Sequence, residues 1–195
     1  MKKIFTIFAF MLVTFTIGCK DSKSDSHATE KNMNESIQNT FFDTPFGASK
    51  EEVIKNFGNH GLHFSQEISN ENPLFFCSAN SEFFSFGNMS WSCINVFLNN
   101  NKFYQIDFYN PKKEKQSAIS DYNGILSAIS EKYKLTKEEP EDTTTYARSV
   151  GYGNNNSRVK VSCYKYETLV SHELWYTASL SYINDSIAEE PSDEL

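Results

Sequence analysis

The stretch SWSCINVFLNNNKFYQIDFY, residues 90–109, decides the fold because it holds two alternating segments separated by three asparagines. In the second segment, Tyr104, Ile106 and Phe108 fall on one side of an extended strand. The residues on the other side are Phe103, Gln105, Asp107 and Tyr109. Such alternation around an Asn-rich turn is typical of a β-hairpin. We therefore predict a hairpin whose Tyr104, Ile106 and Phe108 side chains face the core.

More strands are expected on both sides of this hairpin. The sequence has 17 Phe and 10 Tyr, which favours a sheet over a helical bundle. Short segments rich in aromatic and β-branched residues, separated by Asn, Gly and Ser, are typical of strands. These segments are 62–68, 73–80 and 82–86 before the hairpin, and 143–152, 157–166 and 173–183 after it.

Two helices are also expected. Ser49 and Glu52 have the spacing of a capping box, and three apolar residues and Gly58 follow them. A longer helix is expected to begin at Asn110, with Pro111 at its first helical position. Its apolar residues recur at intervals of three and four and are Ile119, Tyr122, Ile125, Leu126, Ile129 and Tyr133.

The order of these elements is helix, about four strands, helix and three strands. We therefore predict the α+β class, with two tandem helix-then-antiparallel-strands units (about α-β4-α-β3) packed as one domain over residues 41–183. The chain of 195 residues is long enough for one such domain. Residues 184–195 are rich in carboxylates and are expected to form an acidic tail.

The N-terminal residues have the pattern of a targeting signal. Lys2 and Lys3 precede an uncharged apolar run, residues 4–17, which is too short to cross a bilayer and has the length of a signal-peptide core. The run ends at Gly18 and Cys19. Residues 20–40 are polar, so we expect them to form a flexible tether rather than part of the core.

The end of this run, TIGC at 16–19, resembles the lipobox of bacterial lipoproteins, although Ile17 stands where Ala or Ser is commoner. The resemblance implies cleavage between Gly18 and Cys19, acylation of Cys19, and anchoring in the bacterial outer membrane through the N-terminal lipid. Residues 1–18 would then be the signal peptide, 19–40 the lipidated tether, and the domain would face the periplasm or the cell surface. The alternative is an ordinary cleaved signal peptide in which Cys19 is incidental.

A second resemblance concerns the first helix. The segment FGASKEEV, residues 46–53, closed by Gly58, is similar to the opening of small outer-membrane lipoproteins of the BamE (SmpA/OmlA) type. A similar unit is repeated in beta-lactamase inhibitor protein. Proteins of these folds mostly bind other proteins, so the resemblance implies a non-catalytic protein-binding role.

The sequence leaves two interpretations of the cysteines open. If Cys19 carries lipid, Cys77, Cys93 and Cys163 remain, and an odd number cannot all pair within one chain. Cys77 and Cys93 are candidates for a disulfide between neighbouring strands, since the envelope is oxidising. The alternative is three buried thiols that act as small hydrophobic groups.

Charge and motifs exclude several functions. The net charge is −7 and no dense basic stripe is present, so nucleic acid binding is disfavoured. His60 and His63 lack a further ligand at a metal-binding spacing, so no metal site is expected. No catalytic signature flanks a cysteine or serine, so we assign no catalytic residue and no cofactor.

Our leading hypothesis is therefore a non-catalytic envelope lipoprotein whose aromatic sheet docks an unknown protein partner, with Trp91, Trp175 and Tyr176 as the candidate binding surface. One alternative is a thiol- or metal-dependent hydrolase that uses Cys163 or the pair His60 and His63. Another is a glycan-binding accessory lipoprotein. Protein binding predicts a contiguous apolar patch, whereas glycan binding predicts planar aromatics beside Asn and Asp on one open face.

Overall fold

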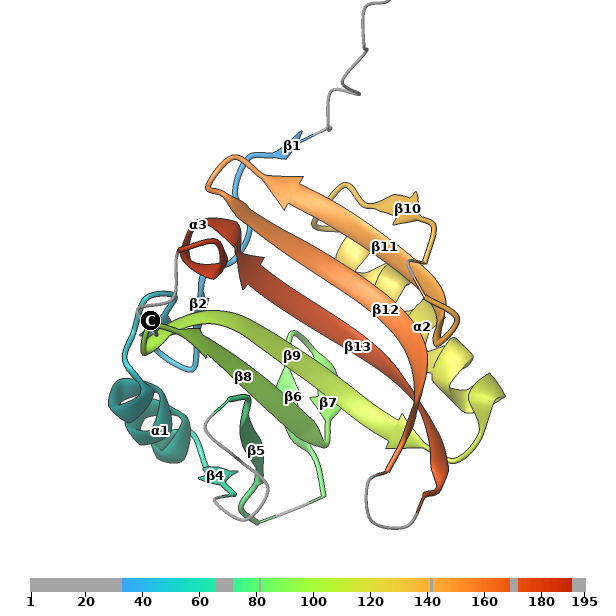
Figure 1. Ribbon diagram of the computed structural model, residues 1–195, viewed down its shortest axis with the longest axis horizontal. Coiled ribbons are helices and arrows are strands. Elements are labelled where there is room, and N and C mark those ends of the chain that lie inside the picture. The colour runs from blue at the N-terminus through green and yellow to red at the C-terminus, as the bar shows by residue number, and fades with distance from the viewer. Residues whose placement is uncertain (1–32, 66–71, 81, 141, 169–171, 191–195) are drawn as a thin grey trace, which may run out of the picture. The chain divides into compact units, whose positions relative to one another are not determined.

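The computed structural model describes residues 33–65, 72–80, 82–140, 142–168 and 172–190. These residues form a nine-stranded sheet in the order β1-β11-β12-β13-β9-β8-β5-β4, with β10 also paired to β11 (Figure 1). Neighbouring strands are antiparallel except for β1 and β11, which are parallel. The strands are β1 (Met33–Asn34), β4 (Leu62–Phe64), β5 (Leu74–Ser78), β8 (Cys93–Asn99), β9 (Lys102–Lys112), β10 (Thr136–Glu138), β11 (Thr145–Gly153), β12 (Ser157–Glu167) and β13 (Leu174–Asn184).

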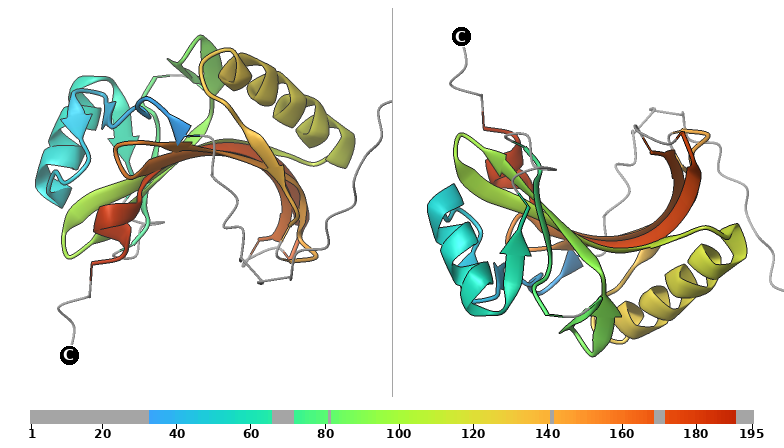
Figure 2. Two further views of the ribbon diagram at one scale, coloured as in Figure 1. Left: turned by 90° about the horizontal axis from the view of Figure 1, so that it is seen from above. Right: turned by 90° about the horizontal axis from the view of Figure 1, so that it is seen from below.

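The sheet is strongly curved, and its two faces are covered differently. On the convex side lie helix α1 (Lys50–Asn59), helix α2 (Lys115–Ser130) and the hairpin of β6 (Phe84–Phe86) and β7 (Met89–Trp91) (Figure 2). A small hairpin of β2 (Thr40–Phe41) and β3 (Thr44–Pro45) joins them. On the concave side, the described part of the chain places only the short helix α3 (Asp185–Ala188), at one end.

The hydrophobic core lies between the convex side of the sheet and these covering elements. Alternate residues of the longest strands point into it, among them Phe108 of β9, Val161 of β12 and Leu180 of β13, each with no exposed surface. Aromatic rings fill much of the space, and Phe86 stacks on Phe108 with 4.2 Å between ring centroids. Helix α2 contributes Tyr122, Ile125 and Ile129 to this core, as its spacing predicts.

The central hairpin is confirmed, but its face assignment is partly wrong. Asn100 and Asn101 both have positive φ, as the turn between β8 and β9 requires. Phe97 pairs with Gln105, whereas Leu98 pairs with Phe103, so Tyr104 is the extra residue of a β-bulge. Ile106 and Phe108 are buried as predicted, but the bulge turns Phe103 into the core and leaves Tyr104 half-buried.

The predicted tandem arrangement is wrong. Strands of both predicted halves belong to one mainly antiparallel sheet, because β13 returns to pair with β9 along eight residue pairs. The fold is therefore mostly β, rather than two helix-then-strand units. Periodicity identifies strands, but it does not say which distant strands pair.

One of the two predicted helix starts is confirmed, and the other is wrong. The capping box of α1 is confirmed: the Ser49 hydroxyl accepts a hydrogen bond from the Glu52 amide, and the Glu52 carboxylate accepts one from the Ser49 amide. The start of α2 at Asn110 is wrong, because Asn110 and Pro111 pair with β13 and extend strand β9. Helix α2 begins at Lys115 instead.

The folded region also extends beyond the boundaries predicted for it. Residues 33–40, expected in the tether, include β1 and Ile37, which has 1% of its surface exposed. The Asn155 side chain holds this segment through hydrogen bonds to the amide and the carbonyl of Ile37, at 3.2 and 2.9 Å. At the other end, Asp185–Ala188 of the predicted tail form α3.

Two glycines give a test of this packing. A Cβ on Gly151 would lie 2.7 Å from the carbonyl oxygen of Lys134, whereas a Cβ on Gly124 in α2 would have no atom within 4 Å. We expect Gly151→Ala to lower the free energy of unfolding by about 1–3 kcal/mol, because backbone must move. Gly124→Ala should raise it by about 0.5–1 kcal/mol, since Ala is the better helix former. Urea unfolding of both variants checks this, and equal effects would contradict it.

Candidate functional site

The uncovered concave side of strands β9, β12 and β13 is the first candidate site. Each of these strands has eleven residues, and their pairing places alternate side chains in rows across the sheet. One row contains Tyr109, Ser179 and Ser162, and the next contains Asp107, Ser181 and Lys160. We call this surface the open face; its residues are Gln105, Asp107, Tyr109, Pro111, Arg158, Lys160, Ser162, Tyr164, Tyr166, Trp175, Thr177, Ser179, Ser181 and Ile183.

Aromatic rings gather at one end of the open face. Tyr109, Tyr164, Tyr166 and Trp175 are all half-buried there, and the rings of Tyr164 and Tyr166 lie 6.4 Å apart at 50° to each other. The ammonium of Lys113 lies 4.0 Å from the centre of the Trp175 ring and holds it by a cation–π contact. This end therefore combines ring surfaces with three phenol hydroxyls.

The three phenols stay protonated at physiological pH. Burial raises the pKa of Tyr109, and nearby Cys93, Tyr164, Tyr166 and Asp107 raise it further. Burial likewise raises the pKa of Tyr164 and Tyr166. The Tyr109 hydroxyl donates a hydrogen bond to Asn95 Oδ1 of β8 at 3.2 Å. Each phenol is thus a neutral group that can both donate and accept hydrogen bonds.

Small hydroxyl side chains form the middle of the open face. Thr177, Ser179 and Ser181 of β13 and Ser162 of β12 are all buried although they lie on the uncovered side. Larger side chains of β9 and β12 stand on both sides of them. The open face is therefore depressed along β13, because the larger side chains of β9 and β12 project further from the sheet.

Asp107 lies beside this row of hydroxyls. Its Oδ1 accepts a hydrogen bond from Gln105 Nε2 at 2.9 Å. Burial raises the pKa of the Asp107 carboxyl. Hydrogen bonds from Gln105 and Ser181 and the positive charge of Lys160 lower the same pKa, but by less than burial raises it. Asp107 and Gln105 thus place a carboxyl and a carboxamide side by side on the open face.

A hollow of about 370 Å³ lies where the open face meets β10 and β11. Arg148 pairs with Glu138 at 3.2 Å, and Tyr152 donates a hydrogen bond to the same carboxylate at 3.2 Å. The hollow is lined by Glu138, Arg148, Val150, Tyr152, Arg158 and Lys160. Most of its lining is therefore polar and cationic.

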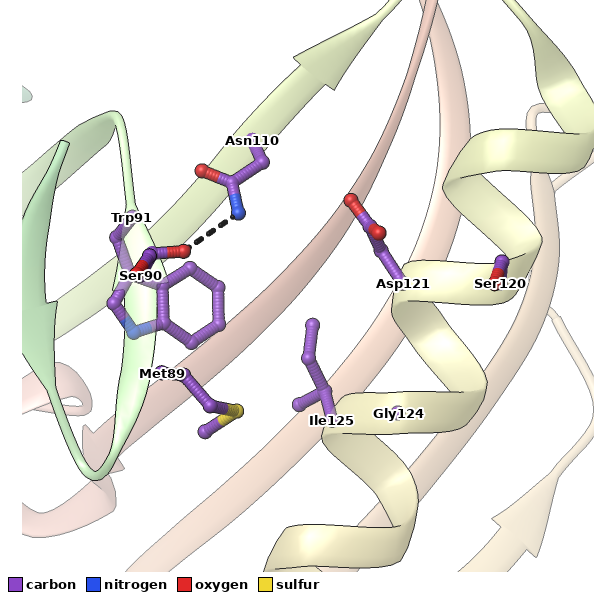
Figure 3. Close-up of a pocket in the computed structure, with 8 residues that line it drawn as sticks. All are labelled: Met89, Ser90, Trp91, Asn110, Ser120, Asp121, Gly124 and Ile125. Atoms are coloured by element: carbon purple, nitrogen blue, oxygen red, sulfur yellow. Dashed lines mark hydrogen bonds between the residues drawn. The ribbon is translucent and has the colours of Figure 1, made fainter. Parts of the chain in front are cut away.

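The second candidate site is a groove of about 330 Å³ on the covered side, between α2 and the β6–β7 hairpin (Figure 3). Met89 and Ile125 project into it from opposite walls, and Gly124 leaves its helix wall open. The carboxylate of Asp121 at its rim is 3.3 Å from Lys112 Nζ. The Asn110 side chain hydrogen bonds to Ser90, so it joins β9 to the hairpin.

The predicted binding surface is divided by the structure. Trp91 is 1% exposed and donates a hydrogen bond from Nε1 to the carbonyl of Phe86, so its assignment to an exposed face is wrong. Tyr176 points to the covered side and stacks with Tyr146 at 6.1 Å. Trp175, its neighbour in sequence, lies on the open face.

Sequence reasoning missed most of the open face. Tyr109, Tyr164, Tyr166 and Lys160 were not among the predicted binding residues. A signal was present, because polar and aromatic residues alternate with apolar ones along residues 157–166. Alternation alone predicts only that one side of the strand is exposed to solvent. The residues form one surface because β12 pairs with β13 and β13 pairs with β9.

The cysteines that were predicted to pair lie directly opposite each other. Cys77 of β5 and Cys93 of β8 are register partners, which places their Cα atoms about 4.5–5.5 Å apart, inside the range of a disulfide. Both thiols are free in this structure, and so is Cys163, which is buried in the core. The pairing of Cys77 with Cys93 stays a prediction.

The histidines do not meet at a common site. His60 pairs with Asp43 at 2.8 Å beside α1, and His63 is an exposed residue of β4. Within the described ranges, no three His, Cys, Asp or Glu side chains are grouped closely enough to hold a metal ion.

Comparison of the chain with protein-family models, with curated proteins and with solved structures finds no match. The lipobox and BamE-type resemblances therefore stay predictions. Cys19 and Gly18 lie outside the described residues. Over the part of the chain that the structure describes, no helix has the length and apolar character needed to cross a membrane.

The facing cysteines give a direct test. In protein purified from an oxidising compartment without reductant, we expect Cys77 and Cys93 to be joined, since neighbouring antiparallel strands already hold them at bonding distance. Peptide mass spectrometry should find these two peptides linked and lighter by two hydrogen atoms, with Cys163 alkylated after denaturation. Alkylation of all three cysteines without reductant would contradict the pairing.

Proposed function

We propose that the protein is a non-catalytic, glycan-binding lipoprotein of the bacterial cell envelope that holds an oligosaccharide on its open face. The observation that carries this proposal is the combination of Tyr109, Tyr164, Tyr166 and Trp175 with hydrogen-bonding side chains on one uncovered surface. Asp107 belongs to that surface, and Asn95 of β8 lies next to it in the strand register. This is the pattern that glycan binding predicts.

Sugar chemistry explains why such a surface suits an oligosaccharide. A pyranose ring presents apolar C–H groups on its faces and hydroxyls around its edge. Aromatic side chains pack against the faces and still offer a polar tip. Tyr, Asn, Gln and carboxylate groups exchange hydrogen bonds with the hydroxyls. The open face offers both kinds of contact along neighbouring strands.

A protein partner is supported less well. Docking of a protein favours a contiguous apolar patch. The large apolar side chains that are most exposed in the described ranges are Met33, Phe83 and Leu174, at 61%, 50% and 48%. Met33 pairs with Tyr152 and Leu174 pairs with Glu167, at opposite ends of the sheet, so Met33 and Leu174 form no common patch.

The hydrolase alternative is also disfavoured. A cysteine nucleophile needs a lowered pKa, because the thiolate is the reactive form. Burial raises the pKa of both Cys93 and Cys163. His60 pairs with Asp43 on an exposed surface. His63 of β4 lies opposite Cys77 of β5 in the strand register. The raised pKa values disfavour a thiolate nucleophile at Cys93 or Cys163.

The envelope location is supported by sequence only. Residues 16–19 resemble a lipobox, so we propose that Cys19 carries lipid and that the segment before residue 33 links the folded region to the membrane. A glycan-binding face on a lipid-anchored chain would hold an oligosaccharide at the envelope.

The proposal is tested by two identical changes on opposite faces of the sheet. Tyr164→Ala removes a ring from the open face, whereas Tyr176→Ala removes one from the covered side. On an array of neutral and acidic plant and bacterial oligosaccharides, we expect the native protein to bind at least one class. Titration calorimetry with that ligand should show about tenfold weaker binding for Tyr164→Ala, as for loss of a central aromatic contact.

Tyr176→Ala is the control and should bind as the native protein does, once thermal unfolding shows that both variants are folded at the assay temperature. Failure of every oligosaccharide to bind, or equal losses for the two variants, would contradict the proposal.

A further inference from the structure

The hollow beside the open face gathers cations in an acidic protein. The chain has a net charge of −7, yet Arg148, Arg158 and Lys160 line the same hollow of about 370 Å³. They belong to neighbouring strands, since Arg148 lies on β11 and the other two lie two residues apart on β12. Such a local excess of positive charge needs an explanation.

The two arginines are held in place by acidic partners. Arg148 Nε lies 3.2 Å from Glu138 Oε2, and Arg158 Nε lies 2.9 Å from Asp185 Oδ1 of α3. Arg148 also donates a hydrogen bond from Nη2 to the carbonyl of Glu139 at 3.3 Å. These contacts hold both guanidiniums at the wall of the hollow, beside Lys160.

Lys160 differs from both arginines. Within the described residues, its ammonium has no hydrogen bond or ion pair of its own. Asp107 of β9 lies in the same row of the open face as Lys160, with Ser181 of β13 between them. The two charged groups interact electrostatically. The two side chains, both within the described ranges, form no ion pair, so the Lys160 ammonium is left facing the hollow.

We propose that this hollow is the anion subsite of the glycan-binding face, so that the ligand is an oligosaccharide with a carboxylate or a sulfate ester on at least one sugar. This inference rests on the proposed function, because the hollow joins the open face at Arg158 and Lys160. The anionic group would lie against the Lys160 ammonium, since charge-assisted hydrogen bonds are stronger than those between neutral groups. The sugars beyond it would follow β13 toward the aromatic end.

The test compares ligands that differ only in charge. Galacturonate hexamer carries a carboxylate on each sugar, and its methyl ester has the same chain without the negative charges. A sulfated neutral hexasaccharide separates sulfate from carboxylate recognition. We expect the native protein to bind at least one anionic hexamer about tenfold more tightly than the ester, and this preference should fall as salt is raised.

Substitution of Lys160 should remove that preference. Lys160→Gln is expected to weaken binding of the anionic hexamer about tenfold while leaving the ester unchanged, and Lys160→Arg should keep the preference. Lys55→Gln makes the same charge change at an exposed site on α1 and should alter neither affinity. Thermal unfolding of each variant shows whether the fold is kept.

The outcomes separate the two proposals. Equal binding of the hexamer and its ester would overturn the anion subsite and leave the glycan-binding proposal standing. An equal loss of affinity for both ligands in Lys160→Gln would also overturn it. Lys160 would then contribute to binding through the shape of the face and not through its charge. Binding of none of these ligands or the array's oligosaccharides would overturn both proposals.

Discussion

The structure depends on the pairing of β13 between β9 and β12 over eleven-residue strands. Because side chains alternate along a strand, Ala178, Leu180 and Tyr182 enter the core while Thr177, Ser179 and Ser181 line the open face. A slip of one residue would exchange the two sets and bury hydroxyls where rings must pack. The apolar contacts on one side of the sheet thus determine which side chains the other side presents.

Small residues along β13 also connect the fold to the proposed function. Large side chains at Thr177, Ser179 and Ser181 would fill the concave side, whereas hydroxyls leave a low surface between the aromatic end and the cationic hollow. The hydroxyls are buried beneath their neighbours, and the Thr177 hydroxyl donates a hydrogen bond to the carbonyl of Ala178 at 3.1 Å. These hydroxyls therefore set the depth of the open face, while the half-buried side chains beside them supply its exposed polar groups.

Local patterns in the sequence predicted local structure well. The capping box at Ser49, the apolar face of α2 and the alternation of the long strands all depend on neighbouring residues, and each is found. Strand pairing, the bulge at Tyr104 and the burial of Trp91 depend on residues far apart in the chain, so no short pattern reports them. Most of the candidate site was missed for the same reason: Tyr109, Tyr164 and Lys160 come onto one surface only when distant strands pair. The tandem arrangement failed because it assumed that consecutive strands stay together.

The proposed function requires that the ligand binds the open face rather than the groove beside α2. Chemical-shift mapping of the ¹⁵N-labelled protein during titration with an oligosaccharide that binds measures this directly. We predict that amides of β12 and β13 shift while those of α2 and β7 stay unchanged. Shifts confined to α2 and the β6–β7 hairpin, with β12 and β13 unaffected, would contradict the account.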